Sequence, residues 1–198
     1  MKEFFMKRDT YILGLLMGSF FAYVGTTVYI PVYLGKAISP TKSVVLPPPF
    51  TFLFFLMELL LVYIGILIGV FWTQRIHQRR PVMTIGGILA GSIALLGFIP
   101  AIHDNNVLSN VFKMITIFFV CINLTAWTYT INEVSRDSGK QIGAILTVAA
   151  LIGCITPVFQ SFLLSIDLFE VGWVLSSILL LLMGVFGYLA PETGEIYT

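Results

Sequence analysis

Residues 50–72 read FTFLFFLMELLLVYIGILIGVFW, and this stretch decides what kind of protein the chain forms. Glu58 is its only charged residue. An α-helix needs about 20 apolar residues to cross the roughly 30 Å of hydrocarbon in a bilayer, whereas shorter apolar runs are typical of buried helices in soluble domains. The stretch therefore predicts a helix that crosses a membrane.

The composition of the whole chain points the same way. Of its 198 residues, 58% are hydrophobic and 11% are charged, whereas about a quarter of the residues in a soluble domain are charged. The mean hydropathy is +0.95. The net charge of +1 leaves none of the basic surface that nucleic-acid binding requires. An ordinary soluble domain is excluded, nucleic acid is not an expected partner, and the lipid bilayer is.

Six apolar stretches of this kind predict an all-α integral membrane protein with a single membrane domain over residues 1–198. Each run is continuously apolar, which favours helices over the alternating strands of a membrane barrel. The predicted helices are Tyr11–Tyr33, Phe50–Trp72, Val82–Ala101, Phe112–Ile131, Ile142–Leu164 and Trp173–Leu189.

The basic residues are distributed unevenly between the two sides that these helices define. Lys36, Lys42 and Lys113 lie on one side, and the rest of the eleven Lys and Arg residues lie on the side of the two termini. Loops rich in Lys and Arg stay in the cytoplasm. We therefore expect a multi-pass topology with both termini on the cytoplasmic side, or on the equivalent matrix side of an organelle membrane.

Three of the predicted helices carry glycines four residues apart. This spacing clears one helix face of side chains, so that a neighbouring backbone can approach closely. These glycine faces serve either packing within one bundle or contact with a second subunit, and the sequence does not decide between the two. The pairs are Gly14 and Gly18, Gly65 and Gly69, and Gly87 and Gly91.

Three segments at predicted helix ends resemble motifs of the major facilitator superfamily of transporters. Residues 74–81, QRIHQRRP, resemble its Asp-Arg-x-Gly-Arg-Arg loop. Residues 133–140, EVSRDSGK, lie where its sugar-porter and organic-ion-transporter branches carry Glu-x-x-Pro-Thr-x-x-Arg, and residues 190–194, APETG, resemble their Pro-Glu-Thr ending. Their order and spacing resemble the C-terminal six-helix half of such a transporter.

The resemblance implies half of a major facilitator fold, built as two inverted three-helix repeats. It also implies that basic and acidic residues near the cytoplasmic helix ends act as a latch while the two halves of a transporter rock. The residues at the matching positions, our gating-motif candidates, are Arg75, Arg79, Arg80, Glu133 and Lys140.

Five positions depart from the family pattern, two of them being Arg136 and Asp137 in place of the Pro-Thr of the second motif. Gln74 stands where the family loop has its acidic residue, and His77 stands where it has glycine. Lys140 replaces the final arginine of the second motif, and lysine lacks the bidentate geometry of arginine. These departures favour a chain that has kept the fold without the full gating motif.

Glu58 is the strongest candidate for a residue of the solute pathway. A charge at membrane depth is costly, so this carboxylate should be protonated, paired or facing water. A position near the outer headgroups, with the side chain reaching into them, is the alternative.

Polar side chains on two other predicted helices complete the pathway candidates. Tyr23 and Thr27 belong to a polar stripe on the first helix, and Asn123 and Trp127 to one on the fourth. An aromatic ring beside an amide can contact an organic solute by stacking or cation-π interaction. Hydrogen bonding between helices is the alternative role for these residues.

No motif of an enzyme is present, since the chain lacks a glycine-rich phosphate loop, an HExxH sequence and a nucleophile elbow. Cys121 and Cys154 both lie within apolar runs, where we expect small packing residues rather than disulfide or metal ligands. We therefore expect no enzymatic activity, no metal site and no cofactor.

A full family member has about twelve membrane helices, with substrate bound between two halves. The expected function is therefore that of a half-size secondary transporter, which moves a small solute by alternating access after pairing with a second six-helix half. That half is a second copy or another chain. A non-transporting structural subunit of a larger membrane complex is the alternative, and a fragment of a longer transporter is a third explanation.

Overall fold

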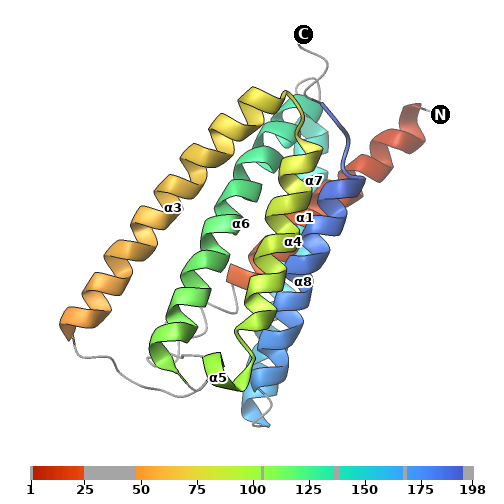
Figure 1. The fold of residues 1–198 in the computed structure, drawn as a ribbon. Helices are drawn as coiled ribbons and strands as arrows, with labels where there is room; N and C mark the ends of the chain where they lie inside the picture. Colours follow the sequence, from red (N-terminus) through yellow and green to blue (C-terminus); the bar gives the residue numbers. More distant parts are fainter. Residues whose placement is uncertain (1, 25–47, 104, 136–138, 167–168, 194–198) are drawn as a thin grey trace.

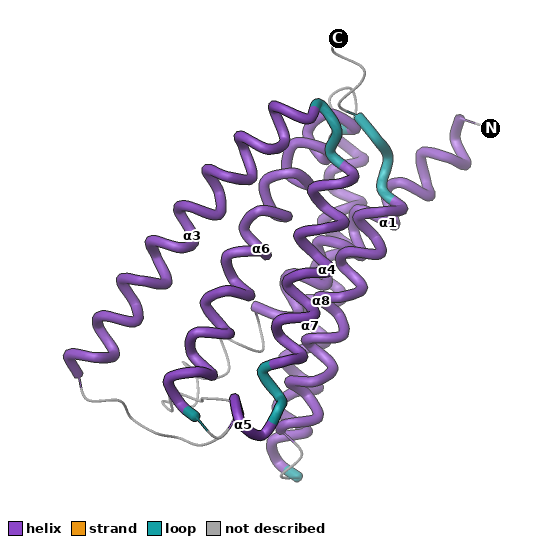
Figure 2. Tube along the Cα trace, viewed as in Figure 1, coloured by secondary structure: helices purple, strands orange, loops and turns teal. Residues whose placement is uncertain are grey.

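The computed structural model describes residues 2–24, 48–103, 105–135, 139–166 and 169–193. Within these ranges all regular secondary structure is α-helical, which confirms the all-α prediction (Figures 1 and 2). The helices are α1 (Lys2–Val24), α3 (Pro48–Ile76), α4 (Arg80–Leu96), α5 (Pro100–His103), α6 (Asn106–Val134), α7 (Gly139–Ser165) and α8 (Phe169–Leu189).

The bounds predicted for the third and first helices differ from those of the structure. The helix predicted over Val82–Ala101 ends at Leu96, and Ala101 belongs to the separate short helix α5. Pro100 explains the break, because its ring clashes with the carbonyl of the fourth residue before it and it lacks an N–H group. The first helix begins at Lys2 rather than Tyr11, and residues 25–33 of its predicted range lie outside the described residues.

The start of α6 also lies earlier than predicted, for a local reason. The Asn105 side chain accepts hydrogen bonds from the backbone N–H groups of Val107 and Leu108. Asparagine is a preferred helix N-cap because its side chain satisfies amides that have no partner within the helix. The helix therefore begins at the cap rather than at the first residue of the apolar run.

Three helices contain segments long and apolar enough to cross a membrane, namely Leu56–Ile76 of α3, Val107–Val134 of α6 and Lys140–Leu163 of α7. Large apolar side chains point outward from two of these helices, with exposed fractions of 63% for Phe71 and 72% for Val158. Such surfaces are unfavourable in water and suited to lipid. Length and composition thus favour a membrane protein and support three of the six predicted spans.

The interior holds polar side chains whose hydrogen bonds are made locally. Ser19, Thr73 and Thr130 are buried, and each hydroxyl donates to the backbone carbonyl four residues earlier in its own helix. This local bond is available to serine and threonine within any helix, and it removes the cost of an unpaired hydroxyl away from water. Polar groups inside and apolar groups outside are what a lipid environment requires.

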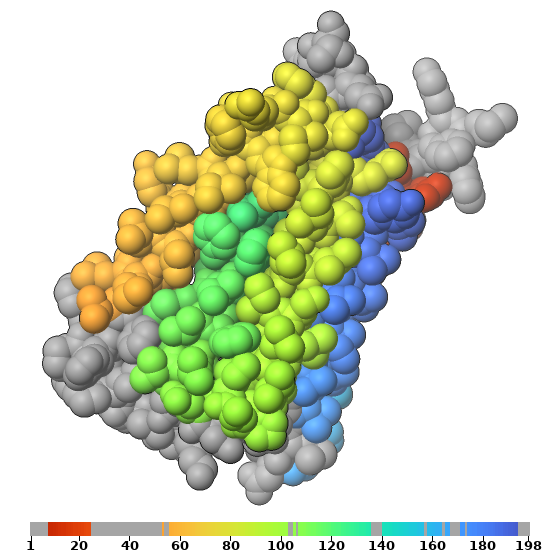
Figure 3. Space-filling model, viewed as in Figure 1, coloured from red at the N-terminus to blue at the C-terminus, as the bar shows by residue number. Residues whose placement is uncertain are grey.

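The long helices pack in the order α7, α1, α8, α4, α6 and α3. Figure 3 shows α3, α6, α4 and α8 side by side on one face, in this order from orange through green to blue. The order reads the same from either end if α1 is exchanged with α6, α3 with α7 and α4 with α8. Each pair of neighbouring helices then becomes another pair that is also packed together. The arrangement is therefore symmetric about the contact between α4 and α8.

The α4–α8 contact is a close approach of two backbones. A Cβ atom added at Gly87 would lie 2.5 Å from the Cα atom of Gly184, and one added at Gly91 would lie 2.5 Å from the Cα atom of Leu181. Real Cβ atoms essentially never come so near another atom. Only glycine at Gly87 and Gly91 allows this contact.

The other two glycine pairs also face helices of the same bundle. Gly14 and Gly18 of α1 pack against Val148 and Ile152 of α7. Gly65 and Gly69 of α3 pack against α6. Of the two uses left open by the sequence, the structure confirms packing within one bundle for all three pairs.

We expect Gly87→Ala to lower the free energy of unfolding by about 1–3 kcal/mol, because the added methyl group meets backbone atoms that cannot move aside. Gly143→Ala on α7 is the matched control, since a Cβ there meets nothing within 4 Å. It should be neutral or stabilise by up to about 1 kcal/mol through helix propensity. Thermal unfolding of the detergent-purified chain measures both, and equal effects would contradict the close approach.

Candidate functional site

Three segments that are far apart in the sequence meet at the end of the bundle where α3 ends and α4 begins. Nη2 of Arg79, at the start of α4, lies 3.0 Å from Oε1 of Glu133, near the end of α6. The hydroxyl group of Thr193, which follows α8, donates to Oε2 of the same carboxylate. We call Arg79, Arg80, Glu133, Glu192 and Thr193 the terminal cluster.

Glu192 caps the first turn of α4. Its Oε1 accepts from the backbone N–H of Arg79 at 2.6 Å, and its Oε2 accepts from that of Arg80 at 3.0 Å. A carboxylate at a helix N-terminus satisfies unpaired amides and complements the helix dipole. Nε of Arg80 also donates to the Ala190 carbonyl at 3.0 Å. The segment after α8 is therefore bound to the start of α4 by the two hydrogen bonds of Glu192 and by the hydrogen bond from Arg80.

Arg79 joins the ends of three helices. Its Nη1 donates to the Thr73 carbonyl in the last turn of α3 at 2.6 Å, and its guanidinium carbon lies 5.2 Å from the centre of the Tyr129 ring on α6. The Arg79 and Glu133 side chains are 13% and 15% exposed. An ion pair shielded from water to this extent is stronger than one at an open surface.

Asp9 adds another carboxyl group to this end of the molecule, where the start of α1 and the end of α8 both lie (Figure 1). Burial raises the pKa of the Asp9 carboxyl above its ordinary value, and the guanidinium groups of Arg8 and Arg80 partly oppose this shift. Asp9 thus holds a proton more readily than an exposed aspartate does.

The structure brings together Arg79, Arg80 and Glu133 of the five gating-motif candidates. Arg75 is exposed, and its guanidinium carbon lies 5.7 Å from the centre of the Phe71 ring. Lys140 is exposed near the start of α7 and has no part in the terminal cluster. Sequence reasoning missed Glu192 and Thr193 as site residues, although the APETG segment contained the signal.

His77 directly follows α3 and has the left-handed backbone conformation, with φ of 54°. This conformation is common just after a helix, where it is adopted most often by glycine, because a Cβ atom makes it unfavourable. The histidine at this turn therefore costs backbone strain, which a glycine at the same position would avoid.

At the opposite end of the bundle, Glu58 of α3 is paired with Lys113 of α6. Nζ of Lys113 lies 3.6 Å from Oε2 of Glu58, and each side chain is 28% exposed. Of the alternatives for Glu58, pairing is the one found. Glu58 precedes Gly65 by seven residues, or about two helical turns, so the sequence places both on the same face of the helix. In the structure this face packs against α6.

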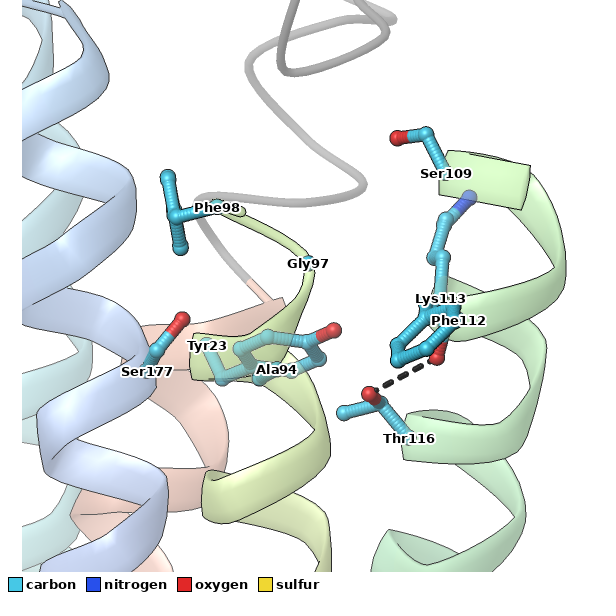
Figure 4. A pocket seen from close by; sticks show the side chains of 9 residues that line it. All are labelled: Tyr23, Ala94, Gly97, Phe98, Ser109, Phe112, Lys113, Thr116 and Ser177. Carbon is cyan, nitrogen blue, oxygen red and sulfur yellow. Dashed lines mark hydrogen bonds between the residues drawn. The ribbon is translucent and has the colours of Figure 1, made fainter. Parts of the chain in front are cut away.

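A cavity of about 30 Å³ adjoins Lys113. It lies where α1, α4, α6 and α8 meet, and Figure 4 shows the ring of Tyr23 between the helices, with its hydroxyl group toward α6. Thr116 is a hydrogen-bond partner of Tyr23, and its own hydroxyl donates to the Phe112 carbonyl at 2.9 Å (Figure 4). Tyr23 therefore belongs to this outer site, whereas Thr27 lies outside the described residues.

Asn123 and Trp127 share one face of α6 deeper in the bundle. The Asn123 amide donates to the Met83 carbonyl of α4, and the Trp127 ring centre lies 6.4 Å from that of Phe20 on α1. Both side chains are buried. Oδ1 of Asn123 and Nε1 of Trp127 have no hydrogen-bond partner among the described residues. Asn123 thus makes the contact between helices that was the alternative to solute binding.

No group of three or more His, Cys, Asp or Glu side chains in the described part of the chain is placed to hold a metal ion. Cys121 is buried, as expected of a packing residue, but Cys154 is exposed on α7. The expectation was wrong for Cys154 because an apolar run does not reveal which side of a helix faces outward.

Comparisons of the chain with protein-family models, with curated proteins and with solved structures gave no match.

We expect His77→Gly to stabilise the fold by about 0.5–1 kcal/mol, since it removes the strain of a left-handed histidine and that gain exceeds the added entropy of the unfolded chain. Gln78→Gly is the control. Gln78 does not have positive φ, so this glycine only adds entropy to the unfolded state and should destabilise. Denaturant unfolding tests both, and a loss of stability in His77→Gly would contradict the strain.

We expect Arg79→Gln to lower the free energy of unfolding by about 1.5–3 kcal/mol, because Glu133 would keep its charge in a shielded site without its cationic partner. Arg75→Gln makes the same change at an exposed arginine and should stay within about 0.5 kcal/mol of the parent. Chemical unfolding in detergent measures the difference. Similar values for the two variants would show that the terminal cluster adds nothing to stability.

Proposed function

We propose that this chain is a six-helix membrane subunit similar to the C-terminal half of a major facilitator transporter. It moves a small solute by alternating access after pairing with a second six-helix half. The observation that carries this proposal is the terminal cluster: the three segments that resemble family motifs are far apart in the sequence and join through Arg79, Glu133 and Glu192.

The symmetry of the packing supports the fold part of the proposal. Two three-helix units, α1–α3–α4 and α6–α7–α8, exchange roles without changing which helices are packed together. Inverted repeats of three helices in each half would produce this symmetry. In this arrangement all six long helices cross the membrane, and both termini lie on the side of the terminal cluster, which is the cytoplasmic or matrix side.

The terminal cluster would act as the latch of the transport cycle. Arg79 binds α3 through the Thr73 carbonyl and α6 through Glu133, while Glu192 binds the start of α4. These bonds hold the cytoplasmic helix ends together. Movement of the start of α4 relative to the end of α6 would break the ion pair and open that end to solvent, and the reverse movement would close it.

A structural subunit is the second candidate function, and one observation favours it. Asn123 and Trp127 are buried in contacts between helices rather than facing an open pathway. A scaffold needs the bundle and its exposed apolar faces but no solute site. The two candidates differ in their partner and in the effect of pathway substitutions.

The partner is tested first, by native mass spectrometry of the complex extracted from its own membrane in mild detergent. A half-transporter of 22.0 kDa should be found with one further six-helix chain, as a dimer or as a pair with another protein. A larger assembly of unrelated subunits would contradict pairing and favour the scaffold.

Transport is tested by uptake of radiolabelled organic anions, organic cations and sugars into vesicles that contain the extracted complex. Glu58→Gln and Asn123→Ala should each reduce uptake at least about tenfold while the complex still assembles, and Gly143→Ala should transport normally. Uptake that is unchanged in both pathway variants would contradict the assignment of these residues. No uptake of any probe by the parent complex would contradict transport.

A further inference from the structure

We propose that a groove between α3 and α6 binds an uncharged membrane lipid that carries a free hydroxyl group. The hydroxyl group of the lipid lies at Asn132, near the end of α6, and its hydrocarbon chain runs along the groove toward the middle of the bilayer. This site would be present whether or not the chain moves a solute.

The groove is large enough for part of a hydrocarbon chain. It lies between two helices that are long and apolar enough to cross a membrane, and Ile66 and Val70 line it on the side of α3. Its volume is about 400 Å³, and pockets for small molecules measure roughly 300–1,000 Å³. The groove therefore accommodates the apolar body of a ligand as well as its polar group.

Polar residues face outward from α6 at this groove. The structure describes every residue of α6 from Ser109 to Val134, and only Thr128 and Asn132 are exposed among them. Both line the groove. A polar group that faces hydrocarbon is unfavourable unless it has a hydrogen-bond partner. The groove is therefore suited to a ligand with a polar group rather than to hydrocarbon chains alone.

Polarity changes along the groove as it does across one leaflet of a bilayer. Leu124 lines the groove eight residues before Asn132, which is about 12 Å along the helix axis. Asn132 is next to Glu133 of the terminal cluster, and charged groups of this kind are costly in hydrocarbon and lie near the membrane surface. One leaflet supplies about half of the roughly 30 Å of hydrocarbon. A lipid head group at Asn132 thus places the chain beside Leu124.

The polar end of the groove favours a ligand that donates a hydrogen bond. The hydroxyl groups of Thr125 and Thr128 already donate to backbone carbonyls one turn earlier in α6, so toward a ligand their oxygens can only accept. Asn132 adds an amide oxygen, and its side chain has no hydrogen bond to another described residue. A hydroxyl group donates to such oxygens, whereas ionised phosphate and carboxylate groups only accept.

The charges near the groove favour an uncharged head group. No charged side chain is among the described residues that line the groove. The guanidinium carbon of Arg79 lies 5.2 Å from the ring centre of Tyr129, which lines the groove, but Arg79 already pairs with Glu133. A charged head group would enter the groove without a counter-ion, at a large cost in desolvation.

The site is tested with the full chain in phosphatidylcholine nanodiscs and a photoreactive monoacylglycerol whose diazirine is in the acyl chain. Mass spectrometry of peptides after illumination measures labelling of α3 and α6. Unlabelled monoacylglycerol should suppress this labelling in a saturable manner. Its diacetyl ester lacks hydroxyl donors, and lysophosphatidate of the same chain adds a charge. Each should require a concentration at least about tenfold higher.

Substitutions at the polar end should weaken binding in proportion to what they remove. Asn132→Leu should raise the monoacylglycerol concentration needed for suppression about five- to tenfold, because it removes the amide at a similar side-chain size. Thr128→Val removes one acceptor oxygen and should raise that concentration about twofold. Thr147→Val is the matched control, since Thr147 is also exposed and also donates to the carbonyl four residues earlier, but lies on α7. It should bind as the parent does.

A larger side chain at the apolar end should block the groove. Ile66→Trp should abolish the suppressible labelling, because the indole ring occupies the space of the acyl chain. Should this variant fail to fold, Val70→Phe fills the groove from the next turn of α3 and makes the same test.

Several outcomes would overturn the proposal. Suppression that is unchanged in Asn132→Leu, or in the variant that fills the groove, would place the lipid elsewhere. Equal competition by lysophosphatidate would make this a phospholipid site, and equal competition by the diacetyl ester would show that no donor is required. Competition by glycerol, which has the hydroxyl groups without the chain, would make it a site for a solute.

Discussion

The contact between the backbones of α4 and α8 is the constraint on which the rest of the structure depends. These two helices form the middle of the packing order, and the remaining helices are added to them on either side. Lipid supplies no hydrophobic force that would drive one apolar helix against another, so close packing must stabilise the association. Gly87, Gly91 and Gly184 permit that packing by leaving backbone in contact with backbone.

Close packing of the helices also bears on where polar and charged side chains lie. Within the helices, hydroxyl groups bond to their own backbone, and the Asn123 amide bonds to the Met83 carbonyl of α4. Charged groups gather near the two ends of the bundle, where part of each side chain reaches solvent. One end holds Arg79 with Glu133, and the other holds Lys113 with Glu58. The bundle thus has an apolar middle between two ionic ends.

Much of the fold was predictable, because lipid fixes the length and composition of a spanning helix, and residues 50–72 satisfy both. The end of the third helix was missed because apolar residues continue past Leu96, and only Pro100 marks the break. The resemblance suggested that basic and acidic residues act together at these helix ends, but it specified neither the pairing of Arg79 with Glu133 nor the cap by Glu192. A carboxylate that caps a helix 112 residues away depends on how the helices pack, which no local pattern contains.

The cap by Glu192 also bears on the order in which the molecule is completed during synthesis. The backbone amides at the start of α4 can be capped only after Glu192 has been synthesised. The glycine face of α4 can be packed only when α8 is present. The helices made in between are therefore complete while α4 still lacks its contact with α8. Assembly of this bundle is a late event, closed by the last segment of the chain that the structure describes.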